Sequence, residues 1–136
     1  MNDKLTFLDT NILVYSYSIS DKIKYERTIE VMQYNSCYIS TQVIGEFCNV
    51  LTKKMHFNPL KIKNLTSEFD LYFNIFTVNK NTAEKALDIL DRYGYSYYDS
   101  LILSSALESN CSILYSEDLQ HGQVIENSLK IVNPFI

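Results

Sequence analysis

Short apolar runs alternate with longer amphipathic stretches along the chain, and this alternation predicts strands separated by helices. The apolar runs are brief and have no polar face, which is typical of strands in a parallel sheet covered on both sides. The predicted strands are residues 5–8, 37–39, 74–78, 112–116 and 130–132.

Helix signals fill the segments between these strands. Asn58-Pro59 starts one helix, expected to run through Phe73, because proline is favoured in a first helical turn. Gly94 ends another. The other predicted helices are a short one near Ile12, a polar surface helix over 21–35, an amphipathic helix over 41–55, one starting at Asn81 and a strongly apolar one over 97–108.

Strands that alternate with helices predict an α/β fold. We expect a three-layer α/β/α sandwich with a mainly parallel central sheet of four to five short strands. The 136 residues, 46% hydrophobic and 21% charged, suit a single globular domain over residues 1–136. The first four residues do not resemble a secretion signal, and no apolar stretch is long enough for a membrane helix, so we expect a cytoplasmic protein.

The three cysteines, Cys37, Cys48 and Cys111, are odd in number and form no C-x-x-C pair. Small buried side chains in a reducing compartment are the favoured interpretation, ahead of a zinc site or a disulfide. The net charge of −4 argues mildly against a nucleic-acid partner. That argument weakens if some of the acids hold metal cations.

Four scattered acids are candidates for chemistry. Asp9 directly follows the first strand and Asp118 follows the strand over 112–116, so both are expected at the carboxyl edge of the sheet, where ligands gather. Asp9 could equally be a plain helix N-cap, and Asp118, taken alone, is better explained as a turn acid. Glu46 lies at the margin of an apolar helix stripe, where a solvated surface glutamate is the default.

Asp99 gives a stronger signal. It shares a helix face with Ile102, Leu103 and Ala106, and that face should point inward. A carboxylate there without a partner would be costly, although Ser96 and Asp99 also have capping-box spacing. Converging carboxylates need a positive charge between them, and oxygen ligands without a His or Cys cluster select Mg²⁺, with Mn²⁺ as a substitute. Such ions suit phosphodiester hydrolysis.

Four segments together resemble the PIN-domain ribonucleases, particularly the VapC-type toxins of bacterial toxin–antitoxin pairs. The likeness extends from Phe7 to Phe135. The segments are Phe7-Leu8-Asp9-Thr10-Asn11-Ile12-Leu13, Ser40-Thr41-Gln42-Val43-Ile44-Gly45-Glu46-Phe47, Tyr97-Tyr98-Asp99-Ser100-Leu101-Ile102 and Leu114-Tyr115-Ser116-Glu117-Asp118-Leu119-Gln120.

The resemblance implies a PIN-like sandwich and a Mg²⁺-dependent endoribonuclease that leaves a 5′-phosphate and a 3′-hydroxyl. Asp9 and Asp99 match the central metal ligands, and Glu46 and Asp118 match the flanking acids. It also implies an RNA substrate, a cognate antitoxin that covers the active-site groove and a homodimer. The matching polar positions beside the acids are Thr10, Asn11 and Ser116.

Other features leave alternatives open. Lys53, Lys54 and His56 could contact RNA phosphates, or could simply be favourable charges at a helix C-terminus. The tyrosines between 93 and 98 could stack on bases or serve packing. His121 is better explained as a turn residue than as a substrate contact.

Rival functions fit less well. A haloacid-dehalogenase-type phosphatase needs a second aspartate where Asn11 stands, and a receiver-type phosphoacceptor needs one where Thr77-Val78-Asn79 stands. The alternative from another class is an RNA- or partner-binding module with little or no turnover. The complete set of four acids argues against it.

Overall fold

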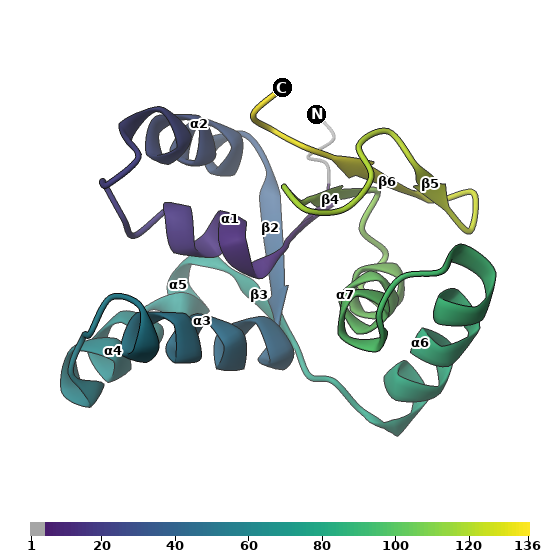
Figure 1. The fold of residues 1–136 in the computed structure, drawn as a ribbon, viewed down its shortest axis with the longest axis horizontal. Coiled ribbons are helices and arrows are strands. Elements are labelled where there is room, and N and C mark those ends of the chain that lie inside the picture. Colours follow the sequence, from purple (N-terminus) through teal and green to yellow (C-terminus); the bar gives the residue numbers. More distant parts are fainter. Residues whose placement is uncertain (1–4) are drawn as a thin grey trace.

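The computed structural model describes residues 5–136, so residues 1–4 of the predicted domain lie outside the described part. Within it, six strands form one sheet in the order β3-β2-β1-β4-β6-β5 (Figure 1). The strands are β1 (Leu5–Leu8), β2 (Ser36–Ser40), β3 (Asn74–Phe76), β4 (Ile113–Tyr115), β5 (Val124–Ile125) and β6 (Leu129–Val132).

The first strand lies in the middle of the sheet. Phe7 of β1 pairs in parallel with Tyr38 of β2 on one side and with Leu114 of β4 on the other. Only β5 runs antiparallel to its neighbour, β6. The mainly parallel sheet is therefore confirmed, but the expected number of strands was too low, because the two-residue strand β5 was missed.

Helices cover both faces of the sheet, which confirms the predicted sandwich. In Figure 1, α1 to α4 lie on one side of the strands, and α6 and α7 lie on the other. The helices are α1 (Thr10–Tyr15), α2 (Lys22–Gln33), α3 (Thr41–Lys53), α4 (Pro59–Thr66), α5 (Phe69–Tyr72), α6 (Lys80–Tyr93) and α7 (Tyr97–Glu108).

The single helix predicted from Asn58 to Phe73 is wrong, because the chain forms α4, a turn and the short α5. The hydroxyls of Thr66 and Ser67 donate to the carbonyls of Lys63 and Asn64 at the end of α4. Such local bonds compete with helix continuation. The apolar pattern was still informative, since Phe69 and Phe73 are buried.

The core anchors the elements that carry the candidate acids. Leu8 is fully buried just before Asp9, and Phe47 is fully buried just after Glu46. Phe47 packs edge-on against Phe69, with ring centroids 5.2 Å apart. Neighbouring side chains in a strand or a helix point to different sides. Burial of Leu8 and Phe47 therefore fixes the side to which the adjacent acid side chain points.

The predicted burial of cysteine holds for Cys37 and Cys111, while Cys48 is partly exposed, and all three thiols are free. Within residues 5–136, none of the helices combines the length and apolar character needed to span a bilayer.

Candidate active site

All four candidate acids line one cavity of about 290 Å³. They come from four different segments of the chain, which the fold brings to one place. Among the described residues, the cavity lining contains no lysine, arginine or histidine. The complete lining is Asp9, Thr10, Asn11, Glu46, Asn49, Val50, Asp99 and Asp118.

Two larger cavities lie elsewhere. One of about 470 Å³ is mostly apolar and runs beside α2 and α5, and one of about 510 Å³ adjoins residues 134–136. Each has a single acid in its lining, Glu68 in the first and Asp21 in the second. Of these three cavities in the described part of the chain, the smallest is the candidate active site, because four acids converge in its lining.

Asp9 and Asp118 follow the carboxyl ends of two neighbouring strands, β1 and β4, as predicted. The Asp9 amide donates to the Tyr115 carbonyl at 3.0 Å, which continues the pairing of β1 with β4. The buried hydroxyl of Ser116, directly after β4, donates to Asp9 Oδ2 at 2.8 Å. Asp9 Oδ1 accepts from the Thr10 amide at 2.7 Å and caps α1. Asp9 is therefore an N-cap, and it also lines the cavity with the other candidate acids.

Burial raises the pKa of Asp9 to about 6, against the opposing effect of the hydrogen bonds from Ser116 and Thr10. The negative charges of Asp99 and Glu46 raise the pKa further. This pattern is typical of a carboxylate that lacks a positive partner. A bound cation would remove that penalty.

Glu46 is held by two polar neighbours on different elements. The Thr10 hydroxyl donates to Glu46 Oε1 at 2.5 Å, which ties α3 to α1. Gln42 Nε2 lies 3.3 Å from Glu46 Oε2 and donates to the Tyr98 carbonyl at 3.0 Å. Gln42 therefore links Glu46 to the first turn of α7.

Asp99 leaves the first turn of α7, where its amide donates to the Ser96 hydroxyl at 3.2 Å. Ile102, Leu103 and Ala106 are buried, so the prediction of an inward face is confirmed. Asp99 itself is only partly buried, because it lies where that face reaches the cavity.

Asp118 is the most exposed of the four acids, and Asn11 Nδ2 donates to its Oδ2 at 2.7 Å. Each polar residue predicted to lie beside the acids thus contacts one of them: Ser116 with Asp9, Thr10 with Glu46 and Asn11 with Asp118.

The donor set fits a hard divalent cation, since the lining offers carboxylate, hydroxyl and amide oxygens and no thiol or imidazole. Within residues 5–136, however, no three acids, histidines or cysteines already lie close enough together to hold one ion. Asp9, Glu46 and Asp118 are instead bonded to neighbouring hydroxyls and to the Asn11 amide. Binding a cation therefore requires some of these side chains to exchange partners.

Sequence reasoning missed three residues. Asn49 and Val50 line the cavity one turn after Glu46, and Gln42 contacts Glu46 from one turn before it. Helical spacing of three and four residues from Glu46 is the signal that could have found them.

The other candidates lie outside the cavity lining. Lys53 and Lys54 are exposed at the end of α3, and the exposed His56 follows with φ of 56°. Tyr95 donates to Gln123 Oε1 at 2.5 Å, which favours the packing interpretation for that tyrosine. His121 Nδ1 accepts from the Asn133 amide at 2.9 Å, so it is a turn residue as expected.

Comparisons with known proteins agree with this architecture. A family model described as PIN domain matches residues 6–126. No curated protein sequence matches the chain.

Solved structures share the fold at low sequence identity. VapC20 of Mycobacterium tuberculosis, described as a sarcin–ricin loop cleaving toxin, is 17% identical with a TM-score of 0.69 over 83% of this chain and 89% of that one. A toxin–antitoxin complex from Klebsiella pneumoniae is 21% identical, with a TM-score of 0.71 over 95% of this chain and 97% of that one. VapBC2 of Rickettsia felis, bound to a promoter DNA fragment, is 20% identical, with a TM-score of 0.67 over 95% of this chain and 99% of that one.

Proposed function

The chain belongs to the PIN-domain family, and on this basis we propose that it is a metal-dependent endoribonuclease and the toxin of a toxin–antitoxin pair. The observation that carries the proposal is the convergence of Asp9, Glu46, Asp99 and Asp118 on one cavity, to which residues 5–136 contribute no basic side chain. Cleavage of the sarcin–ricin loop by the structural neighbour VapC20 supports the choice of RNA as substrate.

In this proposal Asp9 and Asp99 are the central ligands of Mg²⁺ or Mn²⁺, and Glu46 and Asp118 flank them. When bound by these acids, such a cation would supply positive charge against the phosphodiester and would promote ionisation of water. The Ser116 and Thr10 hydroxyls orient the carboxylates of Asp9 and Glu46. The Asn11 amide orients Asp118 from α1.

Purified protein, freed of any partner, should cleave RNA with Mg²⁺ or Mn²⁺ and stop in EDTA. Asp99→Asn should abolish cleavage, because it removes a ligand charge without changing side-chain size. Asp88→Asn is the matched control, since Asp88 is an exposed acid on α6 away from the cavity. Equal cleavage in EDTA would contradict the metal mechanism, and retained activity in Asp99→Asn would remove Asp99 from the site.

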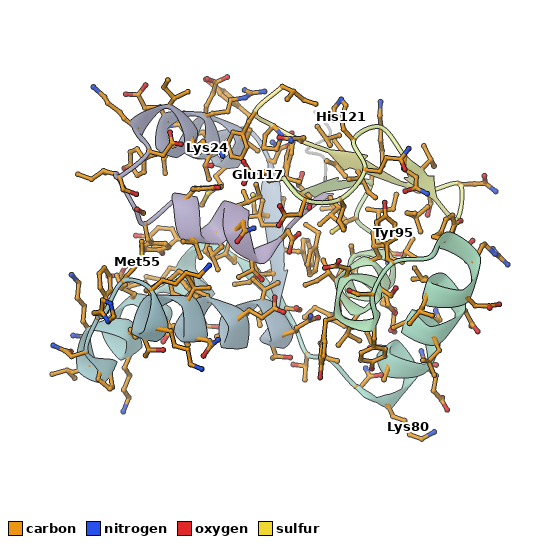
Figure 2. The ribbon with its side chains drawn as sticks, viewed as in Figure 1. Lys24, Met55, Lys80, Tyr95, Glu117 and His121 are labelled. Carbon is orange, nitrogen blue, oxygen red and sulfur yellow. The ribbon has the colours of Figure 1, made fainter. Side chains whose placement is uncertain are left out.

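The proposed contact surface for RNA phosphates is what we call the basic arm, the exposed side chains of Lys53, Lys54, His56, Lys61 and Lys63. No acid lies in the sequence between Glu46 and Glu68. Among the described residues, the lysines outside ion pairs are Lys53, Lys54, Lys61, Lys63, Lys85 and Lys130. Four of these six belong to the basic arm, at the Met55 end of the molecule in Figure 2.

A cognate antitoxin is the proposed protein partner, because neighbours of this fold were solved as toxin–antitoxin complexes. Expression of the chain should arrest growth, and co-expression of the product of an adjacent short reading frame should relieve the arrest. Growth unaffected by expression of the active protein would favour a role other than toxin.

A homodimer is also proposed. Sedimentation of the purified chain should give about twice the 15.8 kDa mass of one copy. A monomer at all concentrations would contradict it. RNA binding without metal-dependent cleavage would instead favour the binding module with little turnover.

A further inference from the structure

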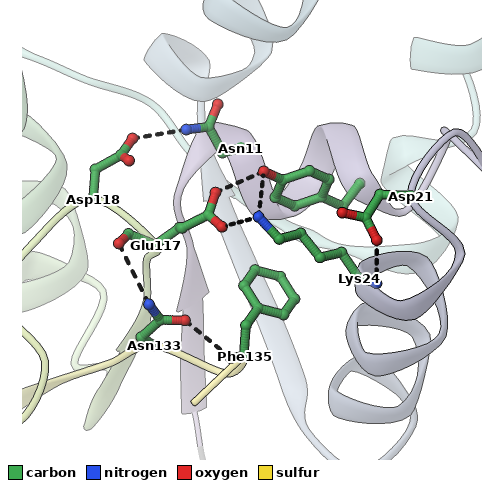
Figure 3. A network of polar contacts seen from close by, with 8 residues as sticks. Asn11, Asp21, Lys24, Glu117, Asp118, Asn133 and Phe135 are labelled. Atoms are coloured by element: carbon green, nitrogen blue, oxygen red, sulfur yellow. Dashed lines mark hydrogen bonds and ion pairs between the residues drawn. The ribbon is translucent and has the colours of Figure 1, made fainter.

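The adjacent acids Glu117 and Asp118 have different partners. Asp118 lines the acidic cavity, where Asn11 is its partner. Both oxygens of Glu117 are occupied elsewhere: Oε1 accepts from the Tyr15 hydroxyl at 2.6 Å, and Oε2 pairs with Lys24 Nζ. Figure 3 shows the two side chains engaged with separate partners. Glu117 therefore ties the chain beside Asp118 to α1 and α2, and it is not a fifth acid of the cavity.

The Lys24–Glu117 pair is the least exposed of the ion pairs among the described residues. Its side chains are 29% and 22% exposed, whereas those of Lys22 and Glu26, which pair along the surface of α2, are 82% and 62% exposed. Lys24 Nζ also lies 5.0 Å from the Tyr15 ring centroid and 5.3 Å from that of Phe135. Surrounding rings reduce water around the pair, so it holds its geometry better than a surface pair.

Asn133 also holds the loop that follows β4, residues 116–121. Its side-chain amide donates to the Glu117 carbonyl at 3.5 Å, and its backbone amide donates to His121 Nδ1 at 2.9 Å. Asn133 therefore contacts the loop on both sides of Asp118. Asp118 is exposed, and its one side-chain hydrogen bond in the described part is with Asn11, so its position depends on how its chain neighbours are fixed.

We propose that Lys24 and Tyr15 are positioning residues which, through Glu117, hold Asp118 at the acidic cavity and so set the affinity of that cavity for a divalent cation. The inference rests on the proposed function, because it takes the cavity to be a metal site. Helix α2, which contributes no residue to the cavity lining, thereby acts on the site through one ion pair.

The test compares three variants in Mn²⁺ titrations followed by electron paramagnetic resonance of the free ion, alongside RNA cleavage. Lys24→Met keeps the apolar stem and removes the charge. It should weaken Mn²⁺ binding about tenfold, the lower end of the range for groups that orient metal ligands. Lys24→Arg restores the charge and should recover most of the affinity. Lys22→Met, two residues away on the exposed side of the same helix, should bind like the wild type.

Cleavage separates positioning from mere stability. Lys24→Met should need about tenfold more Mn²⁺ for half-maximal cleavage, with kcat at saturating Mn²⁺ close to that of the wild type. If the variant does not fold, Tyr15→Phe removes one hydrogen bond to Glu117, keeps the ring packing, and should weaken Mn²⁺ binding about threefold.

Wild-type Mn²⁺ affinity in folded Lys24→Met or Tyr15→Phe, with only a lower melting temperature, would overturn the proposal. If the wild type binds Mn²⁺ but cleaves no RNA, the proposed ribonuclease fails, while a weakened affinity in Lys24→Met still supports the positioning role.

Discussion

At the scale of single residues, Asp9 uses each of its two carboxylate oxygens for a different contact. It caps α1 through the Thr10 amide, and its other oxygen accepts from the Ser116 hydroxyl. Burial nevertheless raises its pKa to about 6, well above the ordinary value of 3.8. A carboxyl with a raised pKa in the folded state stabilises the fold below its ordinary pKa. That contribution is lost as the pH rises through about 6.

We therefore predict that Asp9→Asn is inactive but more stable than the wild type in metal-free buffer above pH 6. The expected gain in the free energy of unfolding is about 1–2 kcal/mol. It is smaller than the free energy that two full pKa units correspond to, because Asp9 is partly exposed. It should vanish near pH 4, where the wild-type carboxyl is protonated. Denaturant unfolding at pH 4, 6 and 8 measures it, and Mg²⁺ should stabilise the wild type but not the variant. A variant less stable at pH 8 would contradict this account.

The cysteines give a second residue-scale prediction. Burial raises the pKa of Cys37 to about 11, and burial together with Cys37 raises that of Cys111 to about 12. At pH 8 roughly a thousandth of Cys37 is thiolate, the reactive form. Only Cys48 should react readily with a thiol reagent in the folded protein. Cys48→Ser should abolish that fast phase, and a fast phase persisting in Cys48→Ser would show that a buried thiol is accessible.

At the scale of elements, capping side chains decide where the helices that carry the acids begin. The Ser40 hydroxyl accepts from the Val43 amide ahead of α3, and Ser96 does the same for Asp99 ahead of α7. Asn58 caps α4, which carries none of the four acids, by accepting from the Lys61 amide. These caps satisfy amides that would otherwise lack partners within the helix.

We predict that Ser96→Ala and Asn58→Ala each lower stability by about 1 kcal/mol. Only Ser96→Ala should also reduce RNA cleavage beyond its effect on folding, because it loosens the turn that holds Asp99. Cleavage measured well below both melting temperatures separates the two effects. An equal loss of cleavage in both variants would show that the cap does not position Asp99.

The sequence predicted these elements unevenly, for physical reasons. Strong periodicity and good caps located α3, α6 and α7 to within a few residues. The break between α4 and α5 has no proline or glycine, so nothing in the pattern indicated it. Strand β5 joins β6 through residues 126–128, of which Glu126 and Asn127 have positive φ. This hairpin turn lacks the usual asparagine–glycine pair.

The sequence predicted which acids form the candidate site, but not which side chains hold those acids in place. Asp9 followed from the strand-end rule and Asp99 from its helix face, whereas Glu46 and Asp118 depended more on the family resemblance. No pattern in the sequence indicated that Gln42 bridges α3 and α7, or that Glu117 pairs with Lys24. Side-chain partners that are far apart in the sequence depend on the assembled fold.

At the scale of the whole molecule, charge is separated within a chain of net charge −4. The four acids gather at the cavity, while the basic arm extends beyond the end of α3. Lys80, which is paired with Glu84, lies at the other end of the molecule (Figure 2). An RNA strand that contacts the arm could reach the cavity along α3, since Glu46 and Lys53 lie on the same helix.

We predict that the double substitution Lys61→Ala/Lys63→Ala, in an inactive Asp99→Asn background, weakens binding of single-stranded RNA. It should also lower the salt dependence, the slope of log affinity against log salt, by about 1.4, because each RNA phosphate that a lysine neutralises adds about 0.7 to that slope. Fluorescence anisotropy at several salt concentrations measures both. Lys85→Ala/Lys130→Ala is the control outside the arm, and equal effects of the two pairs would contradict the assignment.

The central place of β1 in the sheet has a consequence for how the protein is made. Asp9 and Ser116, and likewise Asn11 and Asp118, meet across 107 positions of the chain. A nascent chain emerges from the ribosome in order, so β1 must wait for β4 before both its sides are paired. The four acids therefore converge only after β4 and Asp118 have emerged and paired with the first part of the chain, so a shorter nascent chain has no complete acidic cavity.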